Sequence, residues 1–239
     1  MFWSFINNQK NSNKNKSSEE IDLSLEKLYD HYQHFFKQEH LNDEFADQVK
    51  QKVDEYFNSA KTNAPNESFS MDNLTEAISK FDYSYVQGYD KCSYNLIKHC
   101  KSINYLSILL DFYNSILSRL EFPKYFNISL ITPIIKDKKK PSNDPNNLRP
   151  ISLSNTFAQI FERLILIKSP ELVSTHQNQF GFKKFTSCNH AIFVVKETIA
   201  YYLDKNTDLT LASLDAEKAF DKLWRNGLFL KLINKLTPR

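Results

Sequence analysis

Apolar residues in the first third of the chain recur every three or four positions, which is the spacing of one face of an α-helix. One such series predicts a helix over 18–36, and a second, with an interval of four, predicts a helix over about 43–58. Residues 7–18 are polar and of low complexity, which is typical of disorder. Residues 59–68 have the composition of a linker.

Beyond residue 68 the hydrophobic pattern changes. Ser70 is placed to cap a helix that reaches about residue 81. The apolar, β-branched stretch 127–135 predicts a strand, and Pro133 places that strand at an edge or a bulge. A second strand is expected over 209–215. Further helices are predicted over 92–100, 104–119, 155–168, 187–204 and 227–236. Because helices and strands mix without regular βα alternation, we expect an α+β fold.

Composition and charge narrow the class of protein. The 239 residues, 41% of them hydrophobic, are enough to bury a core. The net charge of +3 is uneven, with −3 over 1–64 and +6 over 65–239, and a mildly basic body suits a polyanionic partner. No apolar run is long enough to span a membrane. Three cysteines without metal-ligand spacing favour a reducing, intracellular compartment, either nucleus or cytoplasm.

The first chemical motif is the stretch 133–153, PIIKDKKKPSNDPNNLRPISL. Lysine and arginine side chains bind phosphate oxygens, although a solvated charged loop is the simpler alternative. The string resembles the fingers region of reverse transcriptases from non-LTR (LINE-type) retrotransposons. The resemblance implies that Lys136 and Arg149 bind the triphosphate of the incoming nucleotide. Leu148 stands where the family usually has tyrosine.

The second motif is QFGFKKFTSCNHAI over 179–192. It resembles the family segment that packs near the template strand between fingers and palm. In this chain Lys183 replaces the usual arginine, and Phe185 stands where a glycine is expected. The alternative is that Phe180 and Phe182 are ordinary core residues. The resemblance implies a template-contact region made of Gln179, Phe180, Gly181, Phe182 and Lys183.

The third motif is LASLDAEKAFDKLWR over 211–225. An unpaired carboxylate at the end of a buried strand is costly, so Asp215 is expected to meet a cation. The segment resembles motif A of the same reverse transcriptases. That resemblance implies that Asp215 and the main-chain carbonyl of Ala216 bind two Mg²⁺ ions. It also implies that Phe220 is the aromatic gate against a ribose 2′-hydroxyl and that Asp221 is structural.

A weaker match covers 75–98, where Gly88 and Asp90 fit a glycine–x–aspartate–glycine pattern and Lys91 replaces the second glycine. The whole resemblance spans roughly residues 70–239. It implies a partial right-hand polymerase, with fingers and an incomplete palm over 65–239 and a helical N-terminal region over 1–64.

The implied function is RNA-directed DNA polymerisation, with an RNA template, a DNA primer and deoxynucleoside triphosphates as partners. Two-metal transfer needs several carboxylates, which the family takes partly from a later [FY]-x-D-D hairpin. No two aspartates are adjacent in this sequence, so we expect the chain alone to be inactive. Two alternatives stay open: a non-catalytic nucleic-acid-binding protein and a helical interaction protein. The sequence does not indicate the oligomeric state.

Overall fold

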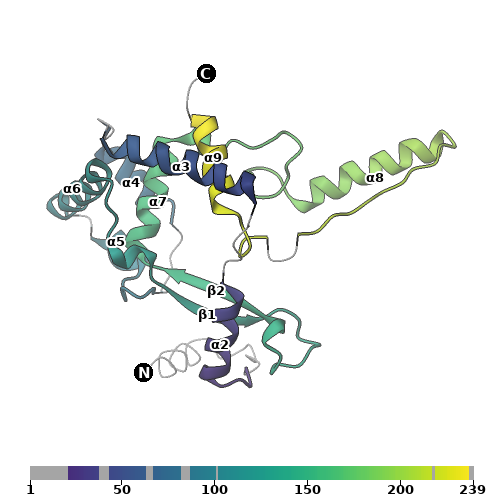
Figure 1. Ribbon diagram of the computed structural model, residues 1–239, viewed down its shortest axis with the longest axis horizontal. Coiled ribbons are helices and arrows are strands. Elements are labelled where there is room, and N and C mark those ends of the chain that lie inside the picture. The colour runs from purple at the N-terminus through teal and green to yellow at the C-terminus, as the bar shows by residue number, and fades with distance from the viewer. Residues whose placement is uncertain are drawn as a thin grey trace.

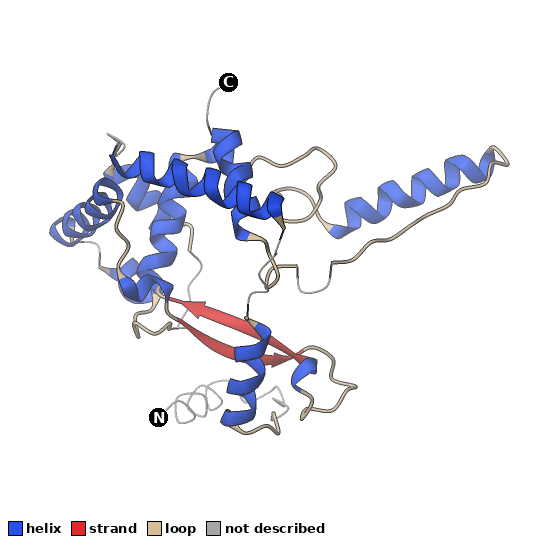
Figure 2. Ribbon diagram, in the orientation of Figure 1, coloured by secondary structure: helices blue, strands red, loops and turns tan. Residues whose placement is uncertain are grey.

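The computed structural model describes residues 21–37, 43–62, 67–81, 87–100, 102–216 and 219–236. Figure 2 shows that these residues form mostly helices with one small sheet. The α-helices are α2 (Leu25–Phe35), α3 (Glu44–Thr62), α4 (Met71–Ser79), α5 (Tyr94–His99), α6 (Ile103–Arg119), α7 (Thr156–Lys168), α8 (Cys188–Asp204) and α9 (Arg225–Leu236). The strands are β1 (Ser129–Ile135) and β2 (Leu148–Ser154), and three 3₁₀ turns are η1 (Lys124–Asn127), η2 (Pro145–Asn147) and η3 (Pro170–Val173).

The helices agree with the expected ones to within a few residues, and their side-chain caps explain where several begin. Ser70 caps α4 by accepting from the Asn73 N–H at 3.2 Å, while the Asn73 side chain accepts from the Ser70 N–H at 3.0 Å. The first helix starts later than expected, because Ser24 caps it. The predicted disordered stretch 7–18 lies outside the described residues.

The main hydrophobic core lies between α4, α5, α6 and α7 (Figure 1). Tyr113 of α6 is fully buried there, and its hydroxyl donates to the Phe157 carbonyl oxygen at 3.0 Å. That bond attaches α6 to the first turn of α7, which directly follows β2. The core therefore supports the end of the hairpin. Its buried members are Phe69, Leu74, Ala77, Phe81, Ile97, Leu109, Tyr113, Ile116, Ile160, Phe161 and Leu164.

The two strands form an antiparallel hairpin, with Ser129 opposite Ser154 and Ile135 opposite Leu148. The strand expected at 127–135 is thus confirmed as β1, whereas β2 was not predicted. Pro133 faces Pro150 in the register. Proline has no N–H to donate, and it is tolerated here because both strands of a two-stranded sheet are edge strands.

Helix α2 covers one face of the hairpin. Leu28 and Tyr32 of α2 pack with Leu148 of β2 in a second hydrophobic cluster, to which Ile131 and Ile135 of β1 contribute. Helix α3 contacts α9, where the Phe57 and Phe229 rings meet edge to face with centroids 5.6 Å apart. The N-terminal helices are therefore packed on the rest of the described chain.

The prediction of a strand over 209–215 is wrong. These residues are irregular and almost entirely exposed, and Leu214 is 98% exposed. Helix α8 has no buried residue, and Figure 1 shows it extending away from the helical core with the following segment running back beside it. A strand needs a neighbour to accept its backbone hydrogen bonds, and no described strand lies beside this one. No helix in the described residues is long and apolar enough to cross a membrane.

Candidate functional site

The pairing of β1 with β2 brings Arg149 of β2 to the end of the hairpin where Lys136 follows β1. Residues directly opposite each other in an antiparallel pair point to the same side, and side chains alternate along a strand. Arg149 lies opposite Ile134, and Lys136 directly follows the last residue of β1. Leu148 points to the other face, where α2 covers it to 1% exposure. Both cationic side chains are exposed, so the two predicted phosphate ligands lie on an open surface.

Hydrogen bonds order the lysine-rich loop that joins the strands. The Lys136 N–H donates to the Asn147 carbonyl oxygen at 2.7 Å, and the Lys136 ammonium donates to the Asn146 carbonyl oxygen at 2.8 Å. The ammonium thus keeps two of its three N–H donors for other acceptors. Among the described residues Arg149 forms no ion pair.

The segment around Gly88 and Asp90 holds the junction between β2 and α7. A Cβ at Gly88 would lie 2.5 Å from the Ser154 carbonyl oxygen, so only glycine fits this close approach. The Asp90 carboxylate accepts from the N–H of Thr156, the first residue of α7, at 2.9 Å, while Asn155 is the N-cap of that helix. The weak fourth motif therefore has a structural role here. Lys91, at the second glycine position, has a φ of 55°, which is the left-handed backbone that favours glycine.

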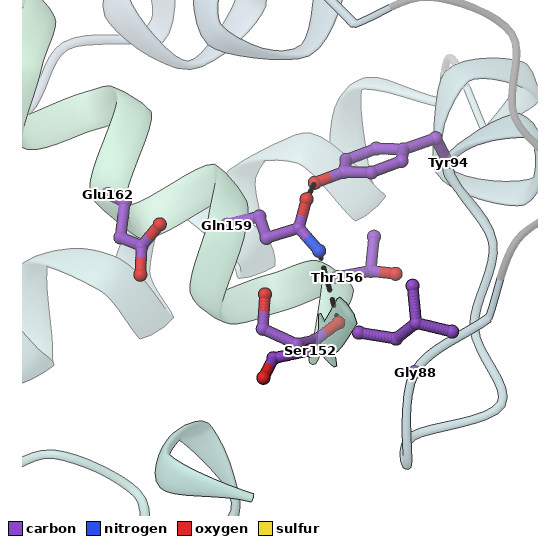
Figure 3. Close-up of a pocket in the computed structure, with 8 residues that line it drawn as sticks. Gly88, Tyr94, Ser152, Thr156, Gln159 and Glu162 are labelled. Atoms are coloured by element: carbon purple, nitrogen blue, oxygen red, sulfur yellow. Dashed lines mark hydrogen bonds between the residues drawn. The ribbon is translucent and has the colours of Figure 1, made fainter. Parts of the chain in front are cut away.

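Beside this junction lies a polar cavity of about 370 Å³ (Figure 3). Gln159 is held in it by two bonds, accepting from the Tyr94 hydroxyl at 2.5 Å and donating to the Ser154 carbonyl oxygen at 3.1 Å. Burial raises the pKa of the Glu162 carboxyl above its ordinary value. None of the sequence-predicted site residues lines this cavity. Its lining is Gly88, Tyr94, Ser152, Leu153, Ser154, Thr156, Gln159 and Glu162.

The predicted template-contact region forms an exposed loop. The Gln179 side chain donates to the Gly181 carbonyl oxygen at 2.9 Å, and the Thr186 hydroxyl is 2.8 Å from the Phe180 carbonyl oxygen and 3.0 Å from that of Lys183. Phe182 is 90% exposed, so the alternative that it belongs to the core is wrong, whereas Phe180 is half-buried. Phe185, where the family has glycine, has a φ of 62°.

The predicted metal ligand Asp215 lies in the irregular stretch after α8. Its side chain and Ala216 are exposed, so the expected burial of the carboxylate is wrong, because no strand forms there. Phe220 is 77% exposed. Its ring meets that of Phe182 edge to face, with centroids 5.8 Å apart. The structure therefore brings the predicted gate together with the predicted template-contact region.

The described residues do not by themselves fit a two-magnesium site. Magnesium takes oxygen ligands in a near-octahedral arrangement, and paired ions share carboxylates. Within the described part of the chain, no three His, Cys, Asp or Glu side chains lie close enough together to hold a metal ion. Asp215 is thus a single candidate carboxylate, with the Ala216 carbonyl beside it in the chain.

The chain is similar in sequence to several polymerases of mobile elements. No protein-family model matches the chain. It is 26% identical over 199 residues to a probable RNA-directed DNA polymerase from transposon BS of Drosophila melanogaster, covering 81% of this chain. It is 28% identical over 189 residues, 77% of this chain, to the corresponding protein from transposon X-element of the same species. The RNA-directed DNA polymerase from mobile element jockey of Drosophila funebris is 29% identical over 179 residues, 73% of this chain. The chain is related to the polymerases of non-LTR retrotransposons.

The predicted resemblance to retrotransposon polymerases is thereby confirmed. The chain spans about a fifth of the length of these retrotransposon polymerases, 21%, 21% and 19% respectively. One residue of the hairpin that the motifs left without a role is Asn147, which is 3% exposed at the end of a polar loop. Its only signal in the sequence is its position directly before the LRPISL string.

Proposed function

We propose that this chain forms the nucleotide-binding fingers and the first part of the palm of an RNA-directed DNA polymerase. Its substrates are deoxynucleoside triphosphates, and its nucleic-acid partners are an RNA template and a DNA primer. The observation that carries the proposal is the hairpin, at one end of which Lys136 and Arg149 are both exposed, while α2 covers the face that carries Leu148. The relationship to the retrotransposon polymerases supports the same conclusion.

The hairpin chemistry suits a triphosphate. The planar guanidinium of Arg149 offers paired N–H donors to two phosphate oxygens, while the Lys136 ammonium acts as a point charge. Three more lysines, at 138–140, are exposed on the connecting loop and add positive charge to the same end of the hairpin. Because α2 closes the face that carries Leu148, an anion approaches this hairpin from the side that carries Arg149.

The palm part of the proposal concerns the segment after α8. We assign Phe220 to discrimination against the ribose 2′-hydroxyl and residues 179–183 to the template strand. The edge-to-face contact of Phe182 with Phe220 supports a common surface for the two. Asp215, with the Ala216 carbonyl, is proposed as one part of a magnesium site that needs further carboxylates. Primer extension by the described residues alone is therefore not expected.

Nucleotide binding tests the proposal directly. We expect the purified full chain to bind a fluorescent deoxynucleoside triphosphate, and inorganic triphosphate to compete while the free nucleoside does not. Arg149→Ala and Lys136→Ala should each weaken binding about tenfold or more, because a hydrogen bond to a charged group contributes about 1.5–3 kcal/mol. The matched control is Lys124→Ala, which removes an exposed lysine in η1 and should leave the affinity unchanged.

A second candidate function, nucleic-acid binding without turnover, is favoured by the exposed lysines of the loop. It predicts that the same chain binds single-stranded RNA with an affinity that falls steeply with salt. If Arg149→Ala and Lys136→Ala leave triphosphate affinity unchanged but neutralising lysines 138–140 flattens the salt dependence for RNA, the second candidate replaces the first. If neither ligand responds to these variants, the hairpin is not the binding surface.

A further inference from the structure

Asn147 is a buried polar residue in the most highly charged loop of the described chain. Its side chain is 3% exposed, whereas the lysines at 136 and 138–140 are all exposed. Burying an amide is costly unless its donors and acceptor are satisfied. The loop therefore has to supply hydrogen-bond partners for this one side chain.

The Asn147 side chain forms hydrogen bonds to the loop through both its oxygen and its nitrogen. Its Oδ1 accepts from the Asp137 N–H at 3.0 Å, and its Nδ2 donates to the Asp137 carbonyl oxygen at 2.9 Å. Nδ2 also lies 3.4 Å from the Lys140 carbonyl oxygen and 3.3 Å from that of Pro141. One amide thus joins Asp137, at the start of the loop, to the turn at Lys140 and Pro141. The acceptor oxygen and the donor nitrogen of this amide are both used.

The same residue links the two predicted phosphate ligands. Its carbonyl oxygen accepts the Lys136 N–H at 2.7 Å, and the preceding carbonyl, of Asn146, accepts the Lys136 ammonium at 2.8 Å. Arg149 follows two positions later in the chain. The path of the backbone at Asn147 therefore determines where the Lys136 ammonium is held relative to Arg149.

We propose that Asn147 is a positioning residue, which holds the loop from Lys136 to Asn147 in a preformed shape for binding a nucleoside triphosphate. This inference rests on the proposed function of the hairpin. A preformed loop has less conformational entropy to lose when the anion binds, so the side chain raises affinity without touching the ligand. Asparagine is required because the position needs an acceptor and donors at once. Aspartate keeps the acceptor for the Asp137 N–H but turns a carboxylate oxygen toward three carbonyl oxygens. Alanine loses all of these side-chain bonds.

A double-mutant cycle tests the coupling between Asn147 and Lys136. The probe is a fluorescent deoxynucleoside triphosphate, and the proteins are the full-length wild type, Asn147→Ala, Lys136→Ala and the double variant. If Asn147 acts by placing Lys136, each single variant weakens binding about tenfold, and the double variant stays near tenfold rather than reaching about a hundredfold. Asn127→Ala, at an exposed asparagine in η1, is the matched control and should bind like the wild type.

Amide hydrogen exchange provides a second readout that does not depend on the ligand. In Asn147→Ala the Asp137 N–H should exchange faster, since its bond to Oδ1 is gone, whereas in Asn147→Asp its protection should persist although triphosphate affinity falls. If Asn147→Ala does not fold, as judged by its urea midpoint, Asn147→Asp carries the test because it keeps the side-chain size.

The outcomes separate the two proposals. Normal triphosphate affinity in Asn147→Asp, or a double variant weakened a hundredfold, overturns the positioning role while the hairpin remains the binding site. An affinity that does not respond to Lys136→Ala overturns the proposed function of the hairpin and, with it, the role of Asn147.

Discussion

Leu148 and Leu214 are the same type of residue, and each directly precedes a residue predicted to bind nucleotide or metal, yet Leu148 is 1% exposed and Leu214 is 98% exposed. The difference lies in their neighbours. Leu148 sits on a strand that pairs with β1 and faces α2. Leu214 lies in a stretch with no strand beside it in the described residues. A leucine in a strand-like segment is therefore buried only where a second segment supplies backbone partners and cover.

The two regions also differ in how their polar groups are held. In the hairpin, one buried amide and several backbone bonds order a loop rich in lysine. In the segment after α8, the side chain of Asp215 is exposed. A binding surface gains affinity from groups that are fixed before the ligand arrives. By this criterion the hairpin is the more complete of the two predicted sites within the described residues.

The largest expected effect tests this comparison with one substitution in each region. Leu148→Ala should lower the free energy of unfolding by about 3 kcal/mol, because it leaves a cavity between β2 and α2. Leu214→Ala should change it by less than about 0.5 kcal/mol, because an exposed side chain loses no packing. Urea unfolding followed by circular dichroism measures both. Equal losses in the two variants would mean that Leu214 is packed in solution, and the contrast between the regions would fail.

The second prediction concerns the core that supports the hairpin. Burial raises the pKa of the Tyr113 hydroxyl above its ordinary value of 10.0. Above pH 10 the unfolded chain releases this proton while the folded chain keeps it, so stability falls as pH rises, by up to about 1.4 kcal/mol per pH unit. Tyr113→Phe should make that fall shallower, although it also removes the bond to Phe157 and lowers stability at neutral pH. Urea midpoints from pH 9 to 11 measure the slope, and identical slopes in the two proteins would contradict the burial of this hydroxyl.

How far the sequence predicts this structure depends on whether the relevant forces are local. Helices were predicted well because their amphipathic spacing and their caps, such as Ser70 at α4, are encoded within a few residues. Strand β2 was missed because LRPISL contains a proline and its pairing with β1 is not local. The prediction of a strand at 209–215 was wrong because, among the described residues, no neighbouring strand pairs with this segment.

The candidate site also shows that local features were predicted from the sequence and non-local ones were not. Lys136 and Arg149 were predicted from the family string, and the structure leaves both side chains exposed at the same end of the hairpin. Asn147 was missed because an asparagine in a run of polar residues looks solvated, and only the folded loop shows its burial. The roles of Lys136, Arg149, Asp215, Phe220 and the template-contact region all remain predictions.

The smallest expected effect uses two residues with left-handed backbone, one next to the hairpin and one in the exposed loop before α8. Lys91 and Phe185 stand where the resemblance predicts glycine, and their φ values are 55° and 62°. Left-handed backbone costs a non-glycine residue roughly 1–2 kcal/mol. Glycine loses about 0.5–1 kcal/mol more conformational entropy on folding. Lys91→Gly and Phe185→Gly should therefore each raise the free energy of unfolding by about 0.5–1 kcal/mol, since both side chains are exposed. Urea unfolding measures the gain.

The control for Phe185→Gly is Lys184→Gly, at an exposed neighbour outside the left-handed region, which should lower stability slightly because it adds only the entropy of glycine. The two glycine variants also sharpen the comparison between the regions. A gain at both positions would show that the loop around Phe185 keeps its backbone in solution although its aromatic side chains are exposed. A gain at Lys91 with a loss at Phe185 would show that only the region around the hairpin holds its conformation, because a loop that samples many backbone states has no left-handed strain for glycine to relieve.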